Sequence, residues 1–366
     1  MKIVQASAYY PPHVGGQENA VQDLSEHLAL AGHEVQVLTS TKGRGERGIT
    51  EESGMRVWRM SGIEFGHAPI MPAFGPALFR AARRESVVHV HIGQAFVPEM
   101  VWLAARLRGF RYIAELHIDF KPSGPAGILL PLYKRLILGR VLRSAAKVVV
   151  LNKKTLHTVK RVYGVKNVAV MSNGINEAYF KLVRRQQKKR PPKQLHLLFV
   201  GRLTRQKNVE MLLRAIAQAK STVKLDIIGD GEEREILEEI TKTLQLTNIV
   251  FHGQLDRLAV LAFYERCDAL VMPSLYEAQP LVLLEAMAAR IPIIGTNVIG
   301  VAEHIWGVGI VVKPTAKALA EGFEALRASH ASLPAMLEKG FLKAQKLRWQ
   351  NLRKDYEALY EEALHE

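Results

Sequence analysis

The sequence predicts an α/β fold with two Rossmann-like, doubly wound parallel-sheet domains and a cleft between them. Short apolar runs alternate with amphipathic stretches of helical period along the 366 residues. The alternation stops at a basic, proline-containing stretch, residues 184–193, and then restarts. Alternating strands and helices are typical of parallel sheets covered by helices, and a chain this long exceeds what one core usually holds.

The first half opens with a strand at Lys2–Ser7, a loop over residues 8–16 and an amphipathic helix over residues 17–31, which Gly32 ends. Its other expected strands are Glu34–Thr39, Val87–Ile92, Tyr112–Leu116 and Lys147–Leu151. The second half is expected to hold strands at Leu195–Val200, Lys224–Ile228, Ile249–His252, Ala269–Met272 and Ile293–Gly295, and helices at Val209–Ala219, Glu232–Leu244, Leu258–Cys267 and Leu281–Ala289.

A long, charged helical stretch, Ala335–Leu364, ends the pattern. We expect its last part, from about residue 346 to residue 366, to pack back on the first domain. The expected domains therefore cover residues 1–183 and residues 184–345.

The composition is that of a globular enzyme, with 23% charged and 48% hydrophobic residues. The single cysteine, Cys267, excludes an internal disulfide and a zinc–cysteine cluster, and it fits a reducing compartment. No uncharged run reaches the roughly 18 to 20 residues of a membrane span. With no signal peptide ahead of the first strand, we expect a cytoplasmic protein.

Positive charge is unevenly spread along the chain, whose net charge is +15. Residues 78–147 hold 12 Lys or Arg against 4 Asp or Glu, and residues 181–193 hold seven basic residues and no acid. A solvated surface, an anionic membrane surface and nucleic acid are the alternatives. No base-stacking motif, zinc finger or helix-turn-helix pattern supports nucleic acid. Basic residues beside apolar helices at 78–84 and 128–138 leave contact with the cytoplasmic membrane face open.

Two carboxylates bracket an expected helix start in the second half. Pro280 suits the first position of a helix, which places Glu277 in the preceding loop and Glu285 in the second turn. A helix N-terminus suits phosphate or polar sugar groups, and the two carboxylates could accept hydrogen bonds from sugar hydroxyls. The alternative is an acidic loop residue followed by one exposed helix carboxylate.

Other unusual residues also follow expected strands, where doubly wound sheets bind their ligands. Gly15 and Gly16 close the first strand–helix loop, where backbone N–H groups could approach a phosphate. Arg202 and Lys207 follow a strand and could neutralise a diphosphate, and His117 follows another. The first loop lacks Gly-x-Gly-x-x-Gly, which argues against a dinucleotide dehydrogenase.

Taken in order, these segments resemble a known family over nearly the whole chain: the retaining glycosyltransferases of family 4, glycosyl transferases group 1, which have the GT-B fold. Glu277 and Glu285 are similar to its Glu-x7-Glu motif. Leu116–Asp119 resembles the segment with its active-site histidine, and Gly201–Lys207 resembles its diphosphate-binding segment. Further resembling landmarks are Ser172–Ile175, Ile228–Gly231, Phe251–Gly253 and Gly300–Glu303.

The resemblance implies transfer of a sugar, with retention, from a UDP- or GDP-linked donor to an acceptor hydroxyl. Arg202 and Lys207 would hold the diphosphate and stabilise the leaving group. Glu285 would bind the ribose, while Glu277 and His117 would contact the sugar. No cofactor or metal is expected, and the chain has no Asp-x-Asp pair. The implied catalytic residues are His117, Arg202, Lys207 and Glu277, and the implied donor-binding residues are Gly15, Gly16, Arg202, Lys207, Gly253, Glu277, Ala278, Gln279, Leu281 and Glu285.

One segment departs from the family pattern. Where Glu-Gly-Phe-Gly is usual, this chain has Glu277-Ala278-Gln279-Pro280, and Pro280 has no N–H to offer a donor sugar. Altered donor specificity and a weak or inactive sugar-nucleotide-binding protein both stay open, as does an epimerase or phosphorylase of the same fold. The acceptor, a glycan or a lipid-linked molecule, is expected on the first domain.

Overall fold

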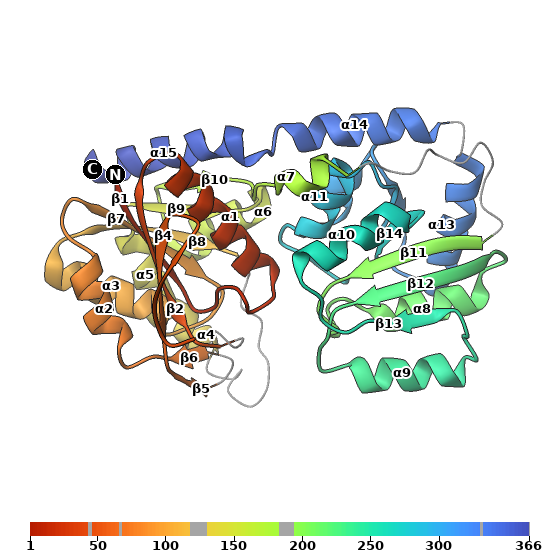
Figure 1. The fold of residues 1–366 in the computed structure, drawn as a ribbon, viewed down its shortest axis with the longest axis horizontal. Coiled ribbons are helices and arrows are strands. Elements are labelled where there is room, and N and C mark those ends of the chain that lie inside the picture. Colours follow the sequence, from red (N-terminus) through yellow and green to blue (C-terminus); the bar gives the residue numbers. More distant parts are fainter. Residues whose placement is uncertain (43–45, 66–67, 118–129, 183–193, 330–331, 366) are drawn as a thin grey trace. The chain divides into compact units, whose positions relative to one another are not determined.

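The computed structural model describes residues 1–42, 46–65, 68–117, 130–182, 194–329 and 332–365. The chain forms two compact units: the first comprises Met1–Gly174 with Trp349–Glu366, and the second comprises Ile175–Arg348. Strands and helices alternate in both units (Figure 1), which confirms the predicted α/β class. The basic stretch 184–193 and the last two residues of the resembling segment Leu116–Asp119 lie outside the described residues.

The first unit is built on an eight-stranded sheet with the order β10-β9-β8-β7-β1-β2-β4-β3. Its strands are β1 (Lys2–Ser7), β2 (Glu34–Ser40), β3 (Gly48–Glu52), β4 (Met55–Met60), β7 (Ser86–Ile92), β8 (Arg111–Leu116), β9 (Lys147–Val150) and β10 (Val168–Val170). β1 pairs in parallel with both β2 and β7, so the order of connection reverses beside β1. Doubly wound sheets bind ligands at such a reversal point, outside the carboxyl ends of the strands.

One edge of this sheet differs from the purely parallel prediction. β3 pairs antiparallel with β4, and the two are joined through Ser53 and Gly54, whose φ values are 48° and 78°. Two successive left-handed residues match the twist of a tight hairpin, for which Ser-Gly is a suitable sequence. A second small antiparallel pair joins β5 (Ile63–Phe65) and β6 (Ala68–Ile70). The sequence analysis did not predict these four strands, because such short segments carry little hydrophobic periodicity.

The two faces of the first sheet are chemically different. Val88, Val90 and Ile92 of β7 point into an apolar core, while His89 and His91 point to the opposite face, because strand residues alternate sides. The helices of this unit are α1 (Gly16–Leu30), α2 (Phe74–Ala81), α3 (Val97–Arg108), α4 (Leu130–Tyr133), a π-helical turn (Lys134–Leu138), α5 (Gly139–Ser144), α6 (Lys153–Tyr163) and α15 (Trp349–His365). α15 packs on the polar face, where it contacts α1, β7 and β8.

The second unit contains a six-stranded sheet, all parallel, with the order β13-β12-β11-β14-β15-β16. Its strands are β11 (Gln194–Val200), β12 (Thr222–Ile228), β13 (Ile249–Phe251), β14 (Ala269–Met272), β15 (Ile293–Thr296) and β16 (Ile310–Val312). Its helices are α7 (Glu177–Phe180), α8 (Val209–Gln218), α9 (Arg234–Thr243), α10 (Arg257–Arg266), α11 (Leu281–Ala288), α12 (Ala302–Ile305), α13 (Ala316–Ala328) and α14 (Leu333–Gln345).

The second sheet is buried on both faces, as parallel sheets usually are. Leu197 and Phe199 of β11 belong to one apolar cluster and Leu198 to another. The order of connection reverses between β11 and β14, which makes their carboxyl ends the expected ligand position of this unit.

The predicted helical stretch Ala335–Leu364 consists of two helices. α14 ends at Gln345 and α15 begins at Trp349. Between them the Leu347 carbonyl accepts a hydrogen bond from the Ile175 N–H at 2.9 Å, so this backbone pairs with a distant segment instead of continuing the helix. In the part of the chain that the structure describes, no helix combines the length and the apolar character needed to cross a membrane.

Candidate functional site

The segments that follow β11 and β14 bring two predicted catalytic residues into contact. Lys207 Nζ lies 2.6 Å from Glu277 Oε1, and the Ser274 hydroxyl donates to the same oxygen at 2.7 Å. The Glu277 side chain is only 7% exposed, against 18% for Lys207. A largely buried carboxylate held by an ammonium group and a hydroxyl has a fixed orientation. Sequence reasoning missed Ser274, although it stands three residues before Glu277 at the end of a strand.

Backbone hydrogen bonds hold the Glu277 loop in this position. The Leu275 N–H donates to the Gln206 carbonyl at 2.8 Å, and the Gln206 amide donates to the Tyr276 carbonyl at 2.8 Å. The Glu277 N–H donates to the Ile299 carbonyl at 2.9 Å. The loop is thereby tied both to the segment that carries Lys207 and to the segment after β15.

Gly300 is packed against the backbone of Glu277. Its φ is +79°, and a Cβ atom at this position would lie 2.0 Å from the Glu277 carbonyl oxygen. Any other residue at position 300 would push the Glu277 loop away. Gly300 begins the Gly300–Glu303 landmark, and the structure therefore supplies a physical reason for that glycine.

The start of α11 differs slightly from the prediction. Pro280 has φ −74° and ψ 114°, so it is the residue before the helix, and Leu281 takes the first helical position. The extended ψ of Pro280 turns its carbonyl toward the helix, where it accepts a hydrogen bond from the Leu283 N–H at 3.1 Å. Glu285 still lies in the second turn of α11, and both Gln279 and Ala278 are at least partly buried.

Glu285 is 7% exposed, so it is not the exposed helix carboxylate of the alternative interpretation. The Tyr264 hydroxyl donates to Glu285 Oε2 at 3.1 Å. Burial, followed by the negative charge of Glu285, raises the pKa of Tyr264 well above its usual range, so Tyr264 stays a hydrogen-bond donor. A buried carboxylate at a helix start suits the recognition of ligand hydroxyls.

Arg202 is exposed, unlike Lys207, Glu277 and Glu285. It follows β11 directly, and its guanidinium forms no hydrogen bond or ion pair with the residues that the structure describes. An arginine placed at the reversal point without such a protein partner can bind an anionic ligand through its planar fork.

Gly253 serves the packing of the loops beneath this site. Gly253 has φ +68°, and its carbonyl accepts a hydrogen bond from the Gly229 N–H at 2.8 Å. Gly229 has φ +130°, and a Cβ atom there would lie 2.0 Å from the Gly201 carbonyl oxygen. The ends of β11, β12 and β13 are therefore packed closer together than side chains would permit.

In the first unit, the two predicted glycines lie at the start of α1. Gly15 is the extended residue before the helix, and Gly16 is its first residue. A Cβ atom on Gly15 would lie 2.2 Å from Glu18 Oε2, and Glu18 in turn is held by His13 Nδ1 at 2.9 Å. The Glu18 carboxylate thus already complements the positive end of this helix. Sequence reasoning missed Glu18 and His13.

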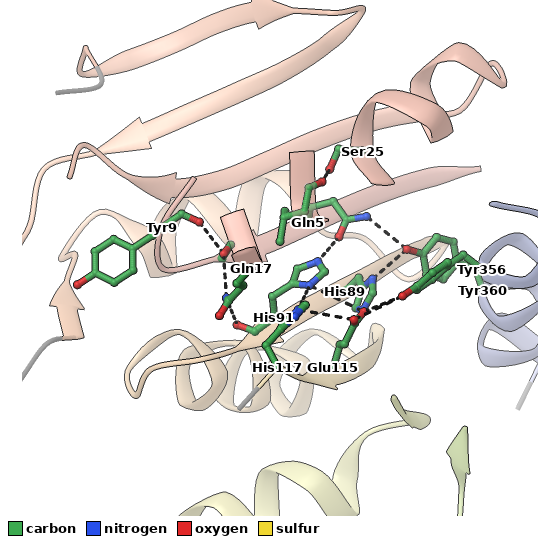
Figure 2. A network of polar contacts seen from close by, with 12 residues as sticks. Gln5, Tyr9, Gln17, Ser25, His89, His91, Glu115, His117, Tyr356 and Tyr360 are labelled. Atoms are coloured by element: carbon green, nitrogen blue, oxygen red, sulfur yellow. Dashed lines mark hydrogen bonds and ion pairs between the residues drawn. The ribbon is translucent and has the colours of Figure 1, made fainter. Parts of the chain in front are cut away.

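His117 follows β8 directly and is 6% exposed. Figure 2 shows that it belongs to a network of polar side chains on the polar face of the first sheet. His117 Nε2 lies 2.9 Å from His91 Nδ1. The other members are Gln5 on β1, His89 and His91 on β7, Glu115 on β8, and Tyr356 and Tyr360 on α15.

The strand register brings this network together. Gln5 pairs with His89, and His91 pairs with Glu115, so the polar residues of β1, β7 and β8 lie on one face. The sequence carries a signal for this that went unused: polar residues recur at every second position in Gln5–Ser7, His89–His91 and Glu115–His117. The partners on α15 have no comparable local signal.

Burial controls the ionisation of this network. It lowers the pKa of His91 well below its usual range, with help from His89 and His117, and it also lowers the pKa of His117. Burial opposes ionisation of Glu115, but the neighbouring imidazoles of His117 and His89 and the Tyr356 hydroxyl outweigh it, so the pKa of Glu115 is lowered. The lowered pKa of Glu115 favours its ionised form, and the lowered pKa values of His91 and His117 favour their neutral forms.

Three members of the network are of the types that bind transition metals. One ligand atom each from His89, His91 and Glu115 lies within 4.8 Å of the others. The ring nitrogens of His91 already contact Gln5 and His117, and those of His89 contact Tyr360 and Glu115, so a metal ion would have to displace these contacts. The prediction of a metal-independent enzyme stays a prediction.

Two doubly wound units, with basic and acidic side chains collected where β11 and β14 end, define a glycosyltransferase of the GT-B class. Comparison with protein families agrees: residues 14–179 match the model "Glycosyltransferase Family 4", and residues 181–341 match "Glycosyl transferases group 1". Together the two models span most of the chain. The protein belongs to glycosyltransferase family 4.

Individual relatives are distant but extend over most of the chain. A glycogen synthase of Mycobacterium tuberculosis is 28% identical over 83% of this chain and 80% of its own length. The structure resembles sucrose-phosphate synthase from Thermosynechococcus elongatus with a TM-score of 0.80 and 23% identity, over 98% of both chains. It also resembles Anabaena HepE in complex with UDP and glucose, with a TM-score of 0.75 and 15% identity, over 98% of this chain and 99% of that one.

Proposed function

We propose that this glycosyltransferase is a retaining, metal-independent enzyme that moves a sugar from a nucleoside-diphosphate sugar, UDP- or GDP-linked, to an acceptor hydroxyl. The observation that carries the proposal is the group formed by Lys207, Glu277 and Ser274 at the point where the second sheet reverses. Arg202, which has no partner among the described residues, follows β11 at the same point. The HepE structure, whose fold is similar, was solved with UDP and glucose bound.

In this proposal Arg202 and Lys207 bind the donor diphosphate. The Arg202 fork suits two phosphate oxygens, and the Lys207 ammonium adds a point charge. Both charges are in place before negative charge develops on the leaving phosphate, so they stabilise the transition state without reorganisation. The Lys207 ammonium also contacts Glu277 Oε1, 2.6 Å away, and this contact limits the motion of the Lys207 side chain.

The two glutamates take different parts of the donor. Glu285, buried at the start of α11, accepts hydrogen bonds from the ribose hydroxyls. Glu277, oriented by Ser274 and Lys207, faces the donor sugar. Because Pro280 lacks an N–H, the Gln279 amide is the group in this loop that can replace the usual backbone donors. We therefore propose that donor-sugar specificity depends on residues 278–280.

The donor proposal is tested by a screen of UDP- and GDP-linked sugars. A bound donor should raise the melting temperature by mass action, and the best one should be consumed when acceptors are added. Glu285→Gln should weaken donor binding about tenfold or more, since a hydrogen bond to a charged group contributes roughly 1.5–3 kcal/mol.

The products separate the alternatives. Transfer that requires an acceptor and retains the anomeric configuration supports the proposal. Conversion of the donor without an acceptor identifies an epimerase, and dependence on inorganic phosphate identifies a phosphorylase. Donor binding without any turnover identifies a binding protein that has lost catalysis at Ala278–Pro280.

For the acceptor, we propose a glycan or lipid-linked molecule met at the cytoplasmic face of an anionic membrane. The supporting observation is a mixed surface over residues 132–140. Leu132, Leu136 and Ile137 are 56%, 42% and 40% exposed, and Lys134, Arg135 and Arg140 lie among them. Exposed apolar side chains beside basic ones suit a lipid–water boundary.

Vesicle sedimentation tests the membrane proposal. The protein should bind vesicles of anionic phospholipid at low salt, and binding should weaken as salt is added. Leu136→Glu with Ile137→Glu should reduce binding more than Val162→Glu, which changes an exposed apolar residue elsewhere on this unit. No binding to anionic vesicles at low salt would refute the proposal.

A further inference from the structure

We propose that His89, His91, Glu115 and His117 form a closed binding site for one divalent transition-metal ion, with zinc as the expected occupant. The first two side chains come from β7, the third from β8 and the fourth from the residue after β8. His91 and Glu115 are paired in register, so their side chains share the polar face of the first sheet (Figure 2). The site goes beyond the proposed function and does not rest on it.

The first observation is a buried nitrogen that lacks a hydrogen bond. His89 Nε2 has no hydrogen-bond partner among the residues that the structure describes, although it lies only 3.0 Å from Glu115 Oε2. A hydrogen bond requires direction as well as distance, so this nitrogen is not aimed at the carboxylate oxygen. An unpaired nitrogen in a protein interior is costly. An ion that meets both atoms from a third direction would remove that cost.

The second observation is the spacing of the ligand atoms. Zinc bonds of about 2.0–2.1 Å in a tetrahedron place neighbouring ligand atoms about 3.3 Å apart. Glu115 Oε2 lies 3.0 Å from His89 Nε2 and 3.9 Å from His91 Nδ1. His117 Nε2 lies 2.9 Å from His91 Nδ1 and 3.6 Å from Glu115 Oε1. These separations lie on both sides of the tetrahedral value, so small side-chain movements would complete the shell.

The third observation concerns the other ring nitrogens. His91 Nε2 lies 2.8 Å from the amide oxygen of Gln5, and His89 Nδ1 lies 2.9 Å from the Tyr360 hydroxyl. Histidines that bind a metal through one nitrogen usually hold a polar partner with the other, and this partner fixes the orientation of the ring. An ion would therefore replace contacts among the four ligands and would keep the contacts with Gln5 and Tyr360.

The donor set indicates the kind of ion. Imidazole nitrogens with a carboxylate oxygen suit zinc, whereas magnesium and calcium prefer shells of oxygen ligands. Metal ligands must also be deprotonated, which means neutral histidines and an ionised carboxylate. The lowered pKa values of His91, His117 and Glu115 favour these forms and so support the geometry.

Burial makes this a structural site. His89, Glu115, His91 and His117 are 0%, 1%, 2% and 6% exposed, and structural zinc is typically enclosed by four protein ligands with no open position. The donor-diphosphate residues of the proposed function are not among the four, so the metal-independent transfer proposed above is a separate matter. Coordination through Nε2 leaves Nδ1 of His117 for its proposed contact with the donor sugar.

The zinc content of the purified protein tests the site directly. The full chain, without a histidine tag, is produced in medium supplemented with zinc, because an ion exchanges slowly with buried ligands. It is then desalted and analysed for metals. About one zinc ion per chain is expected. Protein that holds no stoichiometric zinc would overturn the proposal.

Two histidine variants form a matched pair. His89 Nε2 lies 3.0 Å from Glu115, and His196 Nε2 lies 2.6 Å from Asp226, so each histidine faces a carboxylate that is 1% exposed. His196 belongs to the second unit. His89→Gln should lower the zinc content at least tenfold, while His196→Gln should leave it unchanged. Equal zinc contents in the two variants would overturn the assignment of the site.

X-ray absorption spectra of zinc in the unmodified protein identify the ligands even if His89→Gln does not fold. The expected shell has three imidazole nitrogens and one carboxylate oxygen at about 2.0–2.1 Å. A shell of water oxygens, or one that contains the sulfur of Cys267, would place the zinc elsewhere and overturn the proposal. Gln5→Met, which removes the oxygen beside His91, should weaken zinc binding about tenfold to 100-fold in competition with a chelator.

Stability and activity give the last readouts. Zinc that binds only the folded protein stabilises it by mass action, so removing the ion with a strong chelator should lower the melting temperature by roughly 5–10 °C. His89→Gln should show no such shift, and an equal shift in this variant would contradict the site. Sugar transfer is measured on the same samples. Protein that holds zinc but transfers no sugar supports the metal site and refutes the proposed function, and protein that transfers sugar but never holds zinc does the reverse.

Discussion

Replacing Gly300 with alanine should impair the site without changing a side chain that is proposed to bind the ligand. The added Cβ would start 2.0 Å from the Glu277 carbonyl oxygen. Since real Cβ atoms do not approach within 3.0 Å, the two backbone segments must separate by about 1 Å. That movement acts directly on Glu277, whose contacts with Lys207 and Ser274 are 2.6 and 2.7 Å long.

The magnitude follows from this displacement. A misplacement of about 1 Å in a positioned group can cost roughly 100-fold in rate. Because the movement is shared between the Gly300 and Glu277 segments, we expect kcat/KM for the donor to fall about tenfold to 30-fold. The assay is steady-state transfer from the UDP- or GDP-linked sugar that the screen identifies.

Gly54→Ala provides the control. Gly54 has φ +78°, against +79° for Gly300, but a Cβ atom there would meet nothing within 4 Å. Both substitutions carry the backbone strain of a left-handed alanine, about 1–2 kcal/mol, and only Gly300→Ala moves the Glu277 loop. We expect Gly54→Ala to lose stability while kcat/KM stays within about twofold. If Gly300→Ala matches Gly54→Ala in kcat/KM, the loop is not positioned in the way described.

Two further outcomes follow from the second unit. Arg202→Met should weaken the binding of UDP or GDP, measured by calorimetry, about tenfold to 100-fold. The melting temperature should stay nearly unchanged, because Arg202 is exposed and its guanidinium forms no hydrogen bond or ion pair with the described residues. Arg205 is also exposed, and an equal effect of Arg205→Met would show that only the general positive charge matters. Asp226 accepts hydrogen bonds from His196 at 2.6 Å and His252 at 2.8 Å, and although burial opposes ionisation, these bonds hold the pKa of Asp226 below its usual range. A carboxyl group whose pKa is lowered by folding stabilises the fold above its unfolded-state pKa of about 3.9, and this stabilisation is lost as the pH falls through the folded-state pKa. Asp226→Asn should therefore lower the free energy of unfolding, measured with urea, by about 2 kcal/mol at pH 7 and by progressively less below about pH 4. A cost that does not change with pH would contradict this assignment.

Sequence patterns predicted the parts of the molecule that depend on local regularity. Ala269–Met272 and Lys2–Ser7 were predicted at their observed bounds because a short apolar run bounded by polar loops is typical of a buried strand. The spacing of Glu277 and Glu285 likewise placed both residues correctly around the start of α11. The β3–β4 hairpin was missed because its register depends on a two-residue turn, and its strands carry little periodicity.

Contacts between distant residues could not be predicted in this way. The 2.6 Å contact of Lys207 with Glu277 depends on how the loops after β11 and β14 fold over each other, which no single segment encodes. Glu18 fills the space next to Gly15, and its position depends on the contact with His13 and on the direction in which the chain enters α1. The alternating polar residues of β1, β7 and β8 could be predicted from the sequence to share one face of the sheet. The contacts of this face with Tyr356 and Tyr360 of α15 could not be predicted from it.

The placement of α15 has a consequence for how the protein is made. Tyr356 and Glu115 are 241 residues apart, and the whole second unit, Ile175–Arg348, is synthesised between them. The second unit has all its strands available before the first unit can be completed, which reverses the usual N-to-C order of domain folding during synthesis. Until α15 leaves the ribosome, the first unit exposes Gln5, His89 and Glu115 on an uncovered sheet face. The nascent first unit should therefore stay sensitive to protease until α15 has left the ribosome, and adding α15 as a separate peptide should restore its protection.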